Sequence, residues 1–249
     1  LIFATYSPNG KYIATASRDN TVKLWNANDG SFIKTFSGHE HWVTSVNFSS
    51  DNLSIVSSSF DSTAKTWSVA SGKCIESFKG HSGGLTFASF NNNSSRIVTA
   101  SEDKTAKIWD ITGTCIYTLQ GHNDIVTSAT YNRDGNLILT SSNDNTCKIW
   151  NAKSGTNRVS FFALGTSDYM TQAEDGYYRC SPNAAKLLHY VRKDLQVISF
   201  DQLDMKYNRP DKIFETLENT DTAMKSAYRK AYFKRIRKAG IDSATFSSE

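Results

Sequence analysis

The sequence predicts an all-β fold built from repeated four-stranded units and followed by a short α-helical C-terminal segment. Three observations support this. Tryptophans recur with a period near 42 residues, the hydrophobic residues within one period alternate with polar ones, and this alternation gives way to helical spacing after residue 206. The mean hydropathy of -0.45 and a 39% hydrophobic content are ordinary for a chain of 249 residues that buries its own core.

Three residue types carry the period in a fixed phase. The intervals between successive repeat tryptophans are 42, 42 and 41 residues: Trp25, Trp67, Trp109 and Trp150. One aspartate stands six residues before each tryptophan, in the same order: Asp19, Asp61, Asp103 and Asp144. A Gly-His pair stands ahead of the last three aspartates, its histidine 22 residues earlier in each case: Gly38-His39, Gly80-His81 and Gly121-His122. Three residue types in phase indicate a true structural repeat.

Each repeat contains four short strand patterns separated by turn residues. In the second repeat the strands are Trp42–Phe48, Leu53–Ser59, Thr63–Val69 and Lys73–Phe78. The four repeats therefore span 1–36, 42–78, 84–119 and 125–162, the last with a degenerate outer strand at Arg158–Phe162.

The Gly-His pair, the Asp-x-Thr turn and the closing Trp resemble the WD-repeat (WD40) family, although only Trp109-Asp110 keeps the Trp-Asp dipeptide. The resemblance implies a β-propeller with four regular blades over residues 1–162. Four are fewer than the usual ring of about seven blades. The first repeat also lacks its own Gly-His. We therefore expect additional propeller blades from upstream sequence or from another chain.

Beyond residue 162 the signature stops while strand patterns continue. Two hairpins, Asp168–Gln172 with Tyr177–Ser181 and Leu187–Val191 with Gln196–Phe200, predict an irregular fifth, terminal blade over 163–206. A helical segment or linker then fills 207–249. One helix begins at Pro210 and runs to Leu217, and a longer one runs from about Asp221 to Ala239, capped by Thr220 or Asp221 and ended by Gly240.

The His, Asp and Trp of one repeat can be linked through a strand hydroxyl. The Asp103 carboxylate can accept hydrogen bonds from its own turn and from one ring nitrogen of His81. The other ring nitrogen of His81 can face the hydroxyl of Ser101 or Thr99. That hydroxyl can also accept a hydrogen bond from the indole N–H of Trp109. The family resemblance implies three structural tetrads: His39, Ser59, Asp61, Trp67; His81, Ser101, Asp103, Trp109; and His122, Ser142, Asp144, Trp150. The strand hydroxyl that takes part in each tetrad can also be the one two residues away.

A hydrolase triad is the alternative interpretation of these residues, but a nucleophile is unique whereas this set recurs three times. We therefore predict no enzyme activity within these residues, no cofactor and no metal site. The cysteines Cys74, Cys115, Cys147 and Cys180 form no CxxC pair, and Cys180 lacks a nucleophile motif. Free, mostly buried thiols indicate a reducing compartment and a cytoplasmic location.

Function is then expected at one mouth of the propeller channel, with a protein or peptide as partner. The resemblance implies that this mouth is formed by the residue before each turn Asp and by the residues three and five after each Gly-His histidine. The candidates for partner binding are Arg18, Trp42, Thr44, Phe60, Thr86, Glu102, Ile125 and Asn143. Trp42 and Phe60 would place two aromatics on one rim. Alternatively, Trp42 folds onto the neighbouring blade and Phe60 covers the turn.

The net charge of +4 lies in the C-terminal segment, where clustered Lys and Arg could contact nucleic acid. We favour a solvated face, because aromatic interleaving is weak and the propeller is neutral. No apolar run is long enough for a membrane span, and Leu1–Tyr6 lacks the features of a signal peptide. A start without Met, already inside a strand pattern, predicts a piece of a longer polypeptide.

Two functional hypotheses follow. The first is a non-catalytic scaffold for protein-protein interaction. The second rests on Tyr207–Ile213 and on Asp175–Tyr178, which resemble a junction in bacterial proteins where WD repeats precede a caspase-like domain. That resemblance implies the sensor or regulatory portion of a bacterial multidomain effector, whose downstream peptidase would lie beyond Glu249.

Overall fold

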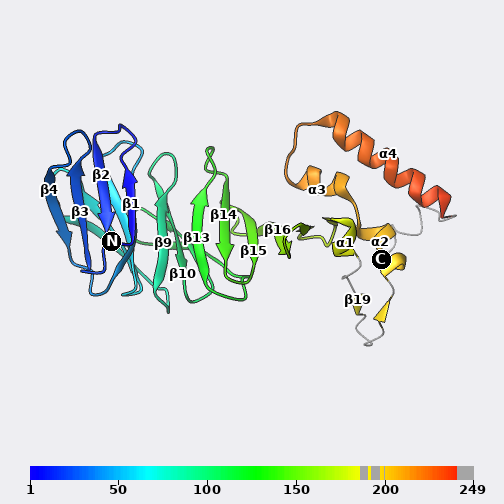
Figure 1. Ribbon diagram of the computed structural model, residues 1–249, viewed down its shortest axis with the longest axis horizontal. Helices are drawn as coiled ribbons and strands as arrows, with labels where there is room; N and C mark the ends of the chain where they lie inside the picture. Colours follow the sequence, from blue (N-terminus) through cyan, green and yellow to red (C-terminus); the bar gives the residue numbers. More distant parts are fainter. Residues whose placement is uncertain (186–189, 192–196, 199, 240–249) are drawn as a thin grey trace. The chain divides into compact units, whose positions relative to one another are not determined.

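The computed structural model describes residues 1–185, 190–191, 197–198 and 200–239 (Figure 1). The chain divides into two compact units, Leu1–Asn157 and Arg158–Glu249. The first unit holds the tryptophan repeat, and the second holds the strands and helices that follow it.

The first unit consists of antiparallel sheets that follow the sequence order. The first sheet contains β1 (Phe3–Tyr6), β2 (Tyr12–Ala16), β3 (Thr21–Asn26) and β4 (Phe32–Ser37). The second contains β5 (Val43–Phe48), β6 (Ser54–Ser59), β7 (Thr63–Ser68) and β8 (Cys74–Lys79). The third contains β9 (Leu85–Phe90), β10 (Arg96–Ser101), β11 (Ala106–Asp110) and β12 (Cys115–Leu119). The strands β13 (Val126–Tyr131), β14 (Leu137–Ser142) and β15 (Thr146–Asn151) pair in the same order. The predicted all-β repeat of four-stranded units is confirmed.

The register within each sheet places the repeat tryptophan opposite a buried aliphatic residue of the preceding strand. Trp67 pairs with Ile55, Trp109 with Ile97, and Trp150 with Ile138. These tryptophans are at most 2% exposed, because each sheet presents its side chains to the next sheet as well as to its own neighbours. The core of the unit therefore lies between sheets, as expected for stacked repeats.

Side chains on the first strands join one sheet to the next. The hydroxyl of Thr44 on β5 donates to the carbonyl of Leu85 (2.7 Å), and that of Thr86 on β9 donates to the carbonyl of Val126 (2.6 Å). The amide of Asn47 likewise donates to the carbonyl of Ala88 (2.8 Å). Because each bond satisfies a main-chain carbonyl of the neighbouring sheet, the first strands are held side by side and the ends of the sheets are aligned.

The strand β16 (Asn157–Leu164) belongs to the second unit except for its first residue, Asn157, which is the last residue of the first unit. β16 pairs with β17 (Asp168–Ala173). β17 pairs in turn with β18 (Tyr178–Cys180), so the first predicted hairpin is present. The short helices α1 (Pro182–Ala185), α2 (Phe200–Tyr207) and α3 (Pro210–Thr216) precede the long helix α4 (Thr222–Lys238). α4 begins as predicted, since the side chain of Asp221 accepts from the main-chain N–H of Met224. Gly240, predicted to end this helix, lies outside the described residues.

The second predicted hairpin differs from the expected terminal blade. β19 (Tyr190–Val191) and β20 (Val197–Ile198) form a two-stranded sheet of their own, so the two hairpins do not share one sheet. The other residues of the predicted strands Leu187–Val191 and Gln196–Phe200 lie outside the described ranges, except Phe200, which begins α2. The sequence did not predict α2. Eight residues are too few for a helical period to be distinguished from a strand pattern.

Candidate protein interface

Three hydrogen-bonded tetrads fix one end of the sheets. In each, a histidine Nδ1 lies 2.7–3.0 Å from the turn carboxylate: His39 with Asp61, His81 with Asp103, and His122 with Asp144. The histidine side chains are 1% exposed and the carboxylates at most 9%. The residue after each aspartate has φ between 64° and 70°, so a tight turn presents the carboxylate to the imidazole.

The tetrad hydroxyl is the earlier of the two candidates in each strand. His81 Nε2 lies 2.8 Å from Thr99 Oγ1, which also accepts from Trp109 Nε1 at 2.8 Å. Ser57 and Thr140 hold the corresponding positions in the other two tetrads. The assignment to Ser59, Ser101 and Ser142 was wrong. Those hydroxyls lie beside the turn, where each donates to a main-chain carbonyl and accepts from the N–H of the turn aspartate.

Electrostatics favour the neutral form of His81 and His122 and the charged form of the three turn aspartates. Burial lowers the pKa of His81 and of His122 and outweighs the hydrogen bond to the aspartate. Burial acts to raise the pKa of Asp103, but hydrogen bonds from Thr105 and His81 hold that pKa below its usual range. With Asp103 charged, His81 Nδ1 donates to it and Nε2 accepts from Thr99. Every polar group of the tetrad is thereby used internally, which explains why the set is structural.

The first sheet contains part of the same network. Trp25 Nε1 donates to Thr15 Oγ1 at 3.0 Å, and Asp19 pairs with Lys23 Nζ at 2.7 Å. That hydrogen bond from Lys23, with others from Thr21, lowers the pKa of Asp19. Within the described residues, the turn aspartate of this sheet is therefore held by Lys23 and Thr21, and its ion pair is partly exposed.

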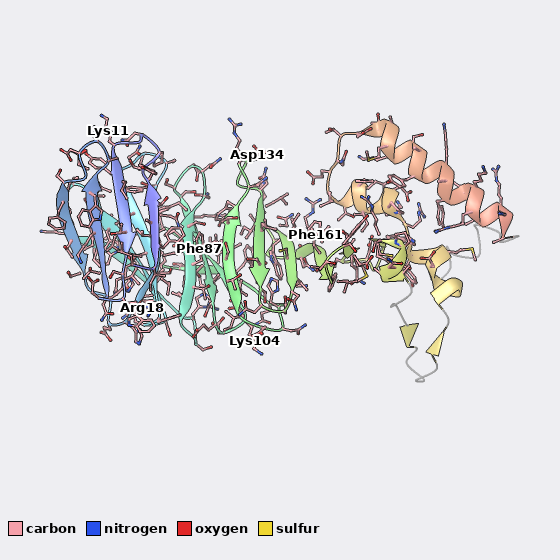
Figure 2. All side chains as sticks on the ribbon, in the orientation of Figure 1. Lys11, Arg18, Phe87, Lys104, Asp134 and Phe161 are labelled. Atoms are coloured by element: carbon pink, nitrogen blue, oxygen red, sulfur yellow. The ribbon has the colours of Figure 1, made fainter. Side chains whose placement is uncertain are left out.

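The turns that carry the aspartates lie at one end of the sheets. Figure 2 shows Arg18 and Lys104, from two such turns, at this end, and Lys11 and Asp134 at the opposite end. At this end Arg18, Trp42 and Phe60 come together, in agreement with what the family resemblance implies. The Arg18 guanidinium carbon lies 4.5 Å from the centre of the Trp42 ring, and the Trp42 and Phe60 rings are 6.0 Å apart. We call Arg18, His41, Trp42 and Phe60 the aromatic rim cluster.

Trp42 remains 37% exposed in this cluster, so it is not folded away between two sheets. Phe60 is half-buried and leans towards the third sheet, where a Cβ on Gly84 would lie only 2.6 Å from its Cδ1. The glycine at position 84 therefore makes the space that Phe60 occupies. The exposure of Trp42 agrees with the rim interpretation, whereas the half-buried Phe60 ring packs towards Gly84 of the next sheet.

The remaining candidates separate into two groups. Glu102 and Asn143 are exposed and Ile125 is half-buried, each on a turn equivalent to that of Trp42 and Phe60. Thr44 is only 8% exposed and bonds to the next sheet, as does the half-buried Thr86. The expectation that these two threonines contact a partner was wrong for Thr44, because its hydroxyl is buried and used internally.

His41 belongs to the cluster and was missed. Its ring centre lies 5.4 Å from that of Trp42 and 6.0 Å from that of Phe60, and its Nδ1 accepts from the main-chain N–H of Trp42 at 2.8 Å. The positional rule selected the third and fifth residues after the Gly-His histidine, whereas His41 is the second. A second aromatic ring beside Trp42 in the sequence was the signal that could have found it.

The described residues contain no cluster of three or more metal-ligating side chains, and no described helix is long and apolar enough to cross a membrane. The described cysteines are free, as predicted. The expectation that they are mostly buried was wrong, because Cys74 and Cys115 on the outer strands are exposed and Cys147 and Cys180 are intermediate.

Repeated four-stranded sheets, joined through their first strands and closed by His-Asp-hydroxyl-Trp networks, define a propeller-type repeat protein. The family model "WD domain, G-beta repeat" matches residues 3–26, 30–68, 72–110 and 113–151, which is more than half of the chain. The chain belongs to this family.

Individual relatives match over about one repeat. Protein Notchless of Drosophila melanogaster is 54% identical over 39 residues, which is 16% of this chain and 8% of the relative. Nuclear distribution protein PAC1 of Mycosarcoma maydis is 38% identical over 52 residues, 21% of this chain and 12% of the relative. The Lissencephaly-1 homolog of Heterostelium pallidum is 46% identical over 37 residues, which is 15% of this chain and 9% of the relative. Because the matches span about a tenth of each relative's length, they support the repeat and not a shared whole-protein activity.

Proposed function

We propose that this chain is a non-catalytic scaffold for protein-protein interaction and that it binds a protein or peptide at the aromatic rim cluster. The observation that carries the proposal is the exposed Trp42 ring, with Arg18 stacked on its face and Phe60 and His41 at its edges. Trp, Tyr and Arg dominate the binding energy of protein interfaces because they bury large, rigid surfaces.

The chemistry of the rim supports binding over catalysis. The tetrad groups that resemble a hydrolase triad are used in internal hydrogen bonds, and their carboxylates are at most 9% exposed. The rim instead offers an exposed aromatic face, a cation and, on neighbouring turns, Glu102 and Asn143. A partner that inserts an apolar side chain beside Trp42 and places a carboxylate near Arg18 fits this surface.

The test is selection of peptides from a random displayed library on the whole chain, followed by affinity measurements with variants. We expect Trp42→Ala with Phe60→Ala to weaken the selected peptides by at least about tenfold, with the melting temperature within a few degrees of the parent. The matched control is Ile75→Ala, which removes a 55% exposed hydrophobic residue from β8. If the selected peptides bind the chain with Trp42→Ala and Phe60→Ala as tightly as they bind the parent, the interface lies elsewhere.

The regulatory alternative, a sensor portion of a bacterial multidomain effector with a downstream caspase-like peptidase, stays a prediction. Its defining stretch forms the start of α3, where Arg209 donates to both carboxylate oxygens of Asp211 at 2.9 and 2.7 Å. This pairing gives the motif a structural role within the second unit, whichever hypothesis holds.

A further inference from the structure

The second unit contains a cavity of about 370 Å³ that is separate from the aromatic rim cluster. It is lined by residues of β17, β18 and α4, by the residue two before α3 and by the first residue of α3: Tyr169, Arg179, Cys180, Asn208, Pro210, Tyr228, Ala231, Tyr232 and Arg235. Its volume is within the range of small-molecule sites. Two of these residues are arginines and none is a carboxylate, so the described wall favours an anion.

Arg179 is the central feature of this wall. Its guanidinium carbon lies 5.5–5.9 Å from the ring centres of Tyr169, Phe214 and Tyr228. Among the described residues, no carboxylate or carbonyl accepts a hydrogen bond from this guanidinium. The N–H donors of this guanidinium therefore have no carboxylate or carbonyl partner in the described part of the chain, and an anion that enters the cavity would supply one.

Arg235 supplies the second cation from α4. Its NH1 donates to Asp204 Oδ2 at 3.2 Å and its NH2 to the carbonyl of Asn208 at 3.0 Å, which fixes the plane of the guanidinium. Its Nε is buried and has no acceptor among the described groups. Asp204 offsets one charge, so among the described residues the two arginines leave the lining with an excess of positive charge.

The other lining groups suit an anion attached to a planar ring. Tyr169, Tyr228 and Tyr232 are aromatic residues of the lining, and one face of the Tyr232 ring is covered by the Arg209 guanidinium at 3.9 Å. Burial raises the pKa of the Cys180 thiol to about 11, with a further contribution from the charge of Asp204. The thiol is therefore neutral near pH 7 and does not repel an anion.

We infer that this cavity binds a phosphate monoester carried by an aromatic or other planar group. A planar carboxylate is satisfied by one guanidinium, whereas a phosphoryl group has three oxygens and can meet two guanidiniums that come from different elements. The tyrosine rings then stack on the group that carries the phosphate. This site is independent of the proposed protein-binding function.

The test is calorimetric titration of the whole 249-residue chain with phenyl phosphate, with benzoate and inorganic phosphate as comparison ligands. We expect saturable binding of phenyl phosphate, and binding of both comparison ligands weaker by at least several-fold. Arg179→Met should weaken phenyl phosphate by at least about tenfold, since it removes a charge-assisted contact. The matched control is Arg229→Met, an exposed arginine of α4 that does not line the cavity, and it should leave the affinity unchanged.

A second variant keeps the test valid if Arg179→Met fails to fold, which circular dichroism will show. Ala231→Trp fills the cavity from an exposed position on α4 without removing a charge, and it should abolish binding. Absence of saturable phenyl phosphate binding to the parent, or equal affinity in the parent and in Ala231→Trp, would overturn the proposal. Equal affinity for benzoate or for inorganic phosphate would overturn the assignment to a phosphate on a planar group.

Discussion

Replacing Thr99 tests the tetrad most directly, because two substitutions separate the hydroxyl from the methyl group. Thr99 is fully buried, and its Oγ1 bonds at 2.8 Å to both His81 Nε2 and Trp109 Nε1. Thr99→Val keeps the volume and removes the hydroxyl. Thr99→Ser keeps the hydroxyl, as Ser57 does at the equivalent position, and removes only the methyl group.

The expected magnitudes differ clearly. Thr99→Val leaves one indole N–H and one imidazole nitrogen buried without a partner, and each costs about 1–3 kcal/mol, so the free energy of unfolding should fall by about 2–6 kcal/mol. Thr99→Ser removes one buried methyl group, for which the loss is about 0.5–1.5 kcal/mol. The loss in Thr99→Val therefore measures the hydroxyl and its two bonds, and the loss in Thr99→Ser measures the methyl group.

The assay is urea unfolding at neutral pH, followed by tryptophan fluorescence, together with hydrogen exchange of the Trp109 indole N–H by NMR. We expect faster indole exchange in Thr99→Val and parent-like exchange in Thr99→Ser. A loss of stability in Thr99→Val that is no larger than in Thr99→Ser would refute the reasoning, since it would show that the hydroxyl and its two bonds contribute no more than one buried methyl group.

Two further predictions concern pH and the rim. The pKa values of His81 and His122 are lowered in the folded chain, so the unfolded chain takes up protons first. The free energy of unfolding should therefore be greatest above the ordinary histidine value of 6.5 and fall as the pH drops below it. The lowered pKa values of Asp61, Asp103 and Asp144 add a second loss below about pH 4. Urea unfolding across this range checks both, and a flat profile between pH 6.5 and 5 would contradict the histidine assignment. Gly84→Ala should cost about 1–3 kcal/mol by pushing on Phe60 and less in a Phe60→Ala background; additive effects in this double-mutant cycle would show that the two residues are not coupled.

The period in the sequence was sufficient to predict the sheets, because Trp, Asp and Gly-His in phase leave one architecture. It was not sufficient to choose the tetrad hydroxyl. Thr99 and Ser101 are two residues apart on β10 and so lie on the same face of the sheet, and the same holds for the pairs on β6 and β14. Only the distance to the histidine separates them. Between β18 and α4 the described elements are short, and no repeat remained to constrain the strand and helix assignments.

The same turns that hold the tetrads also position the variable rim. The N–H of the residue before each turn aspartate donates to the carbonyl of the third residue after the Gly-His histidine: Phe60 to Trp42, Glu102 to Gly84, and Asn143 to Ile125, at 2.9–3.0 Å. This main-chain bond does not depend on the side chains, so the repeat can vary them without loss of the turn. Of these three turns only the first carries two aromatic rings, and the next turn has glycine where one of those rings needs space. A surface that differs between otherwise equivalent repeats is therefore where binding specificity is expected to reside.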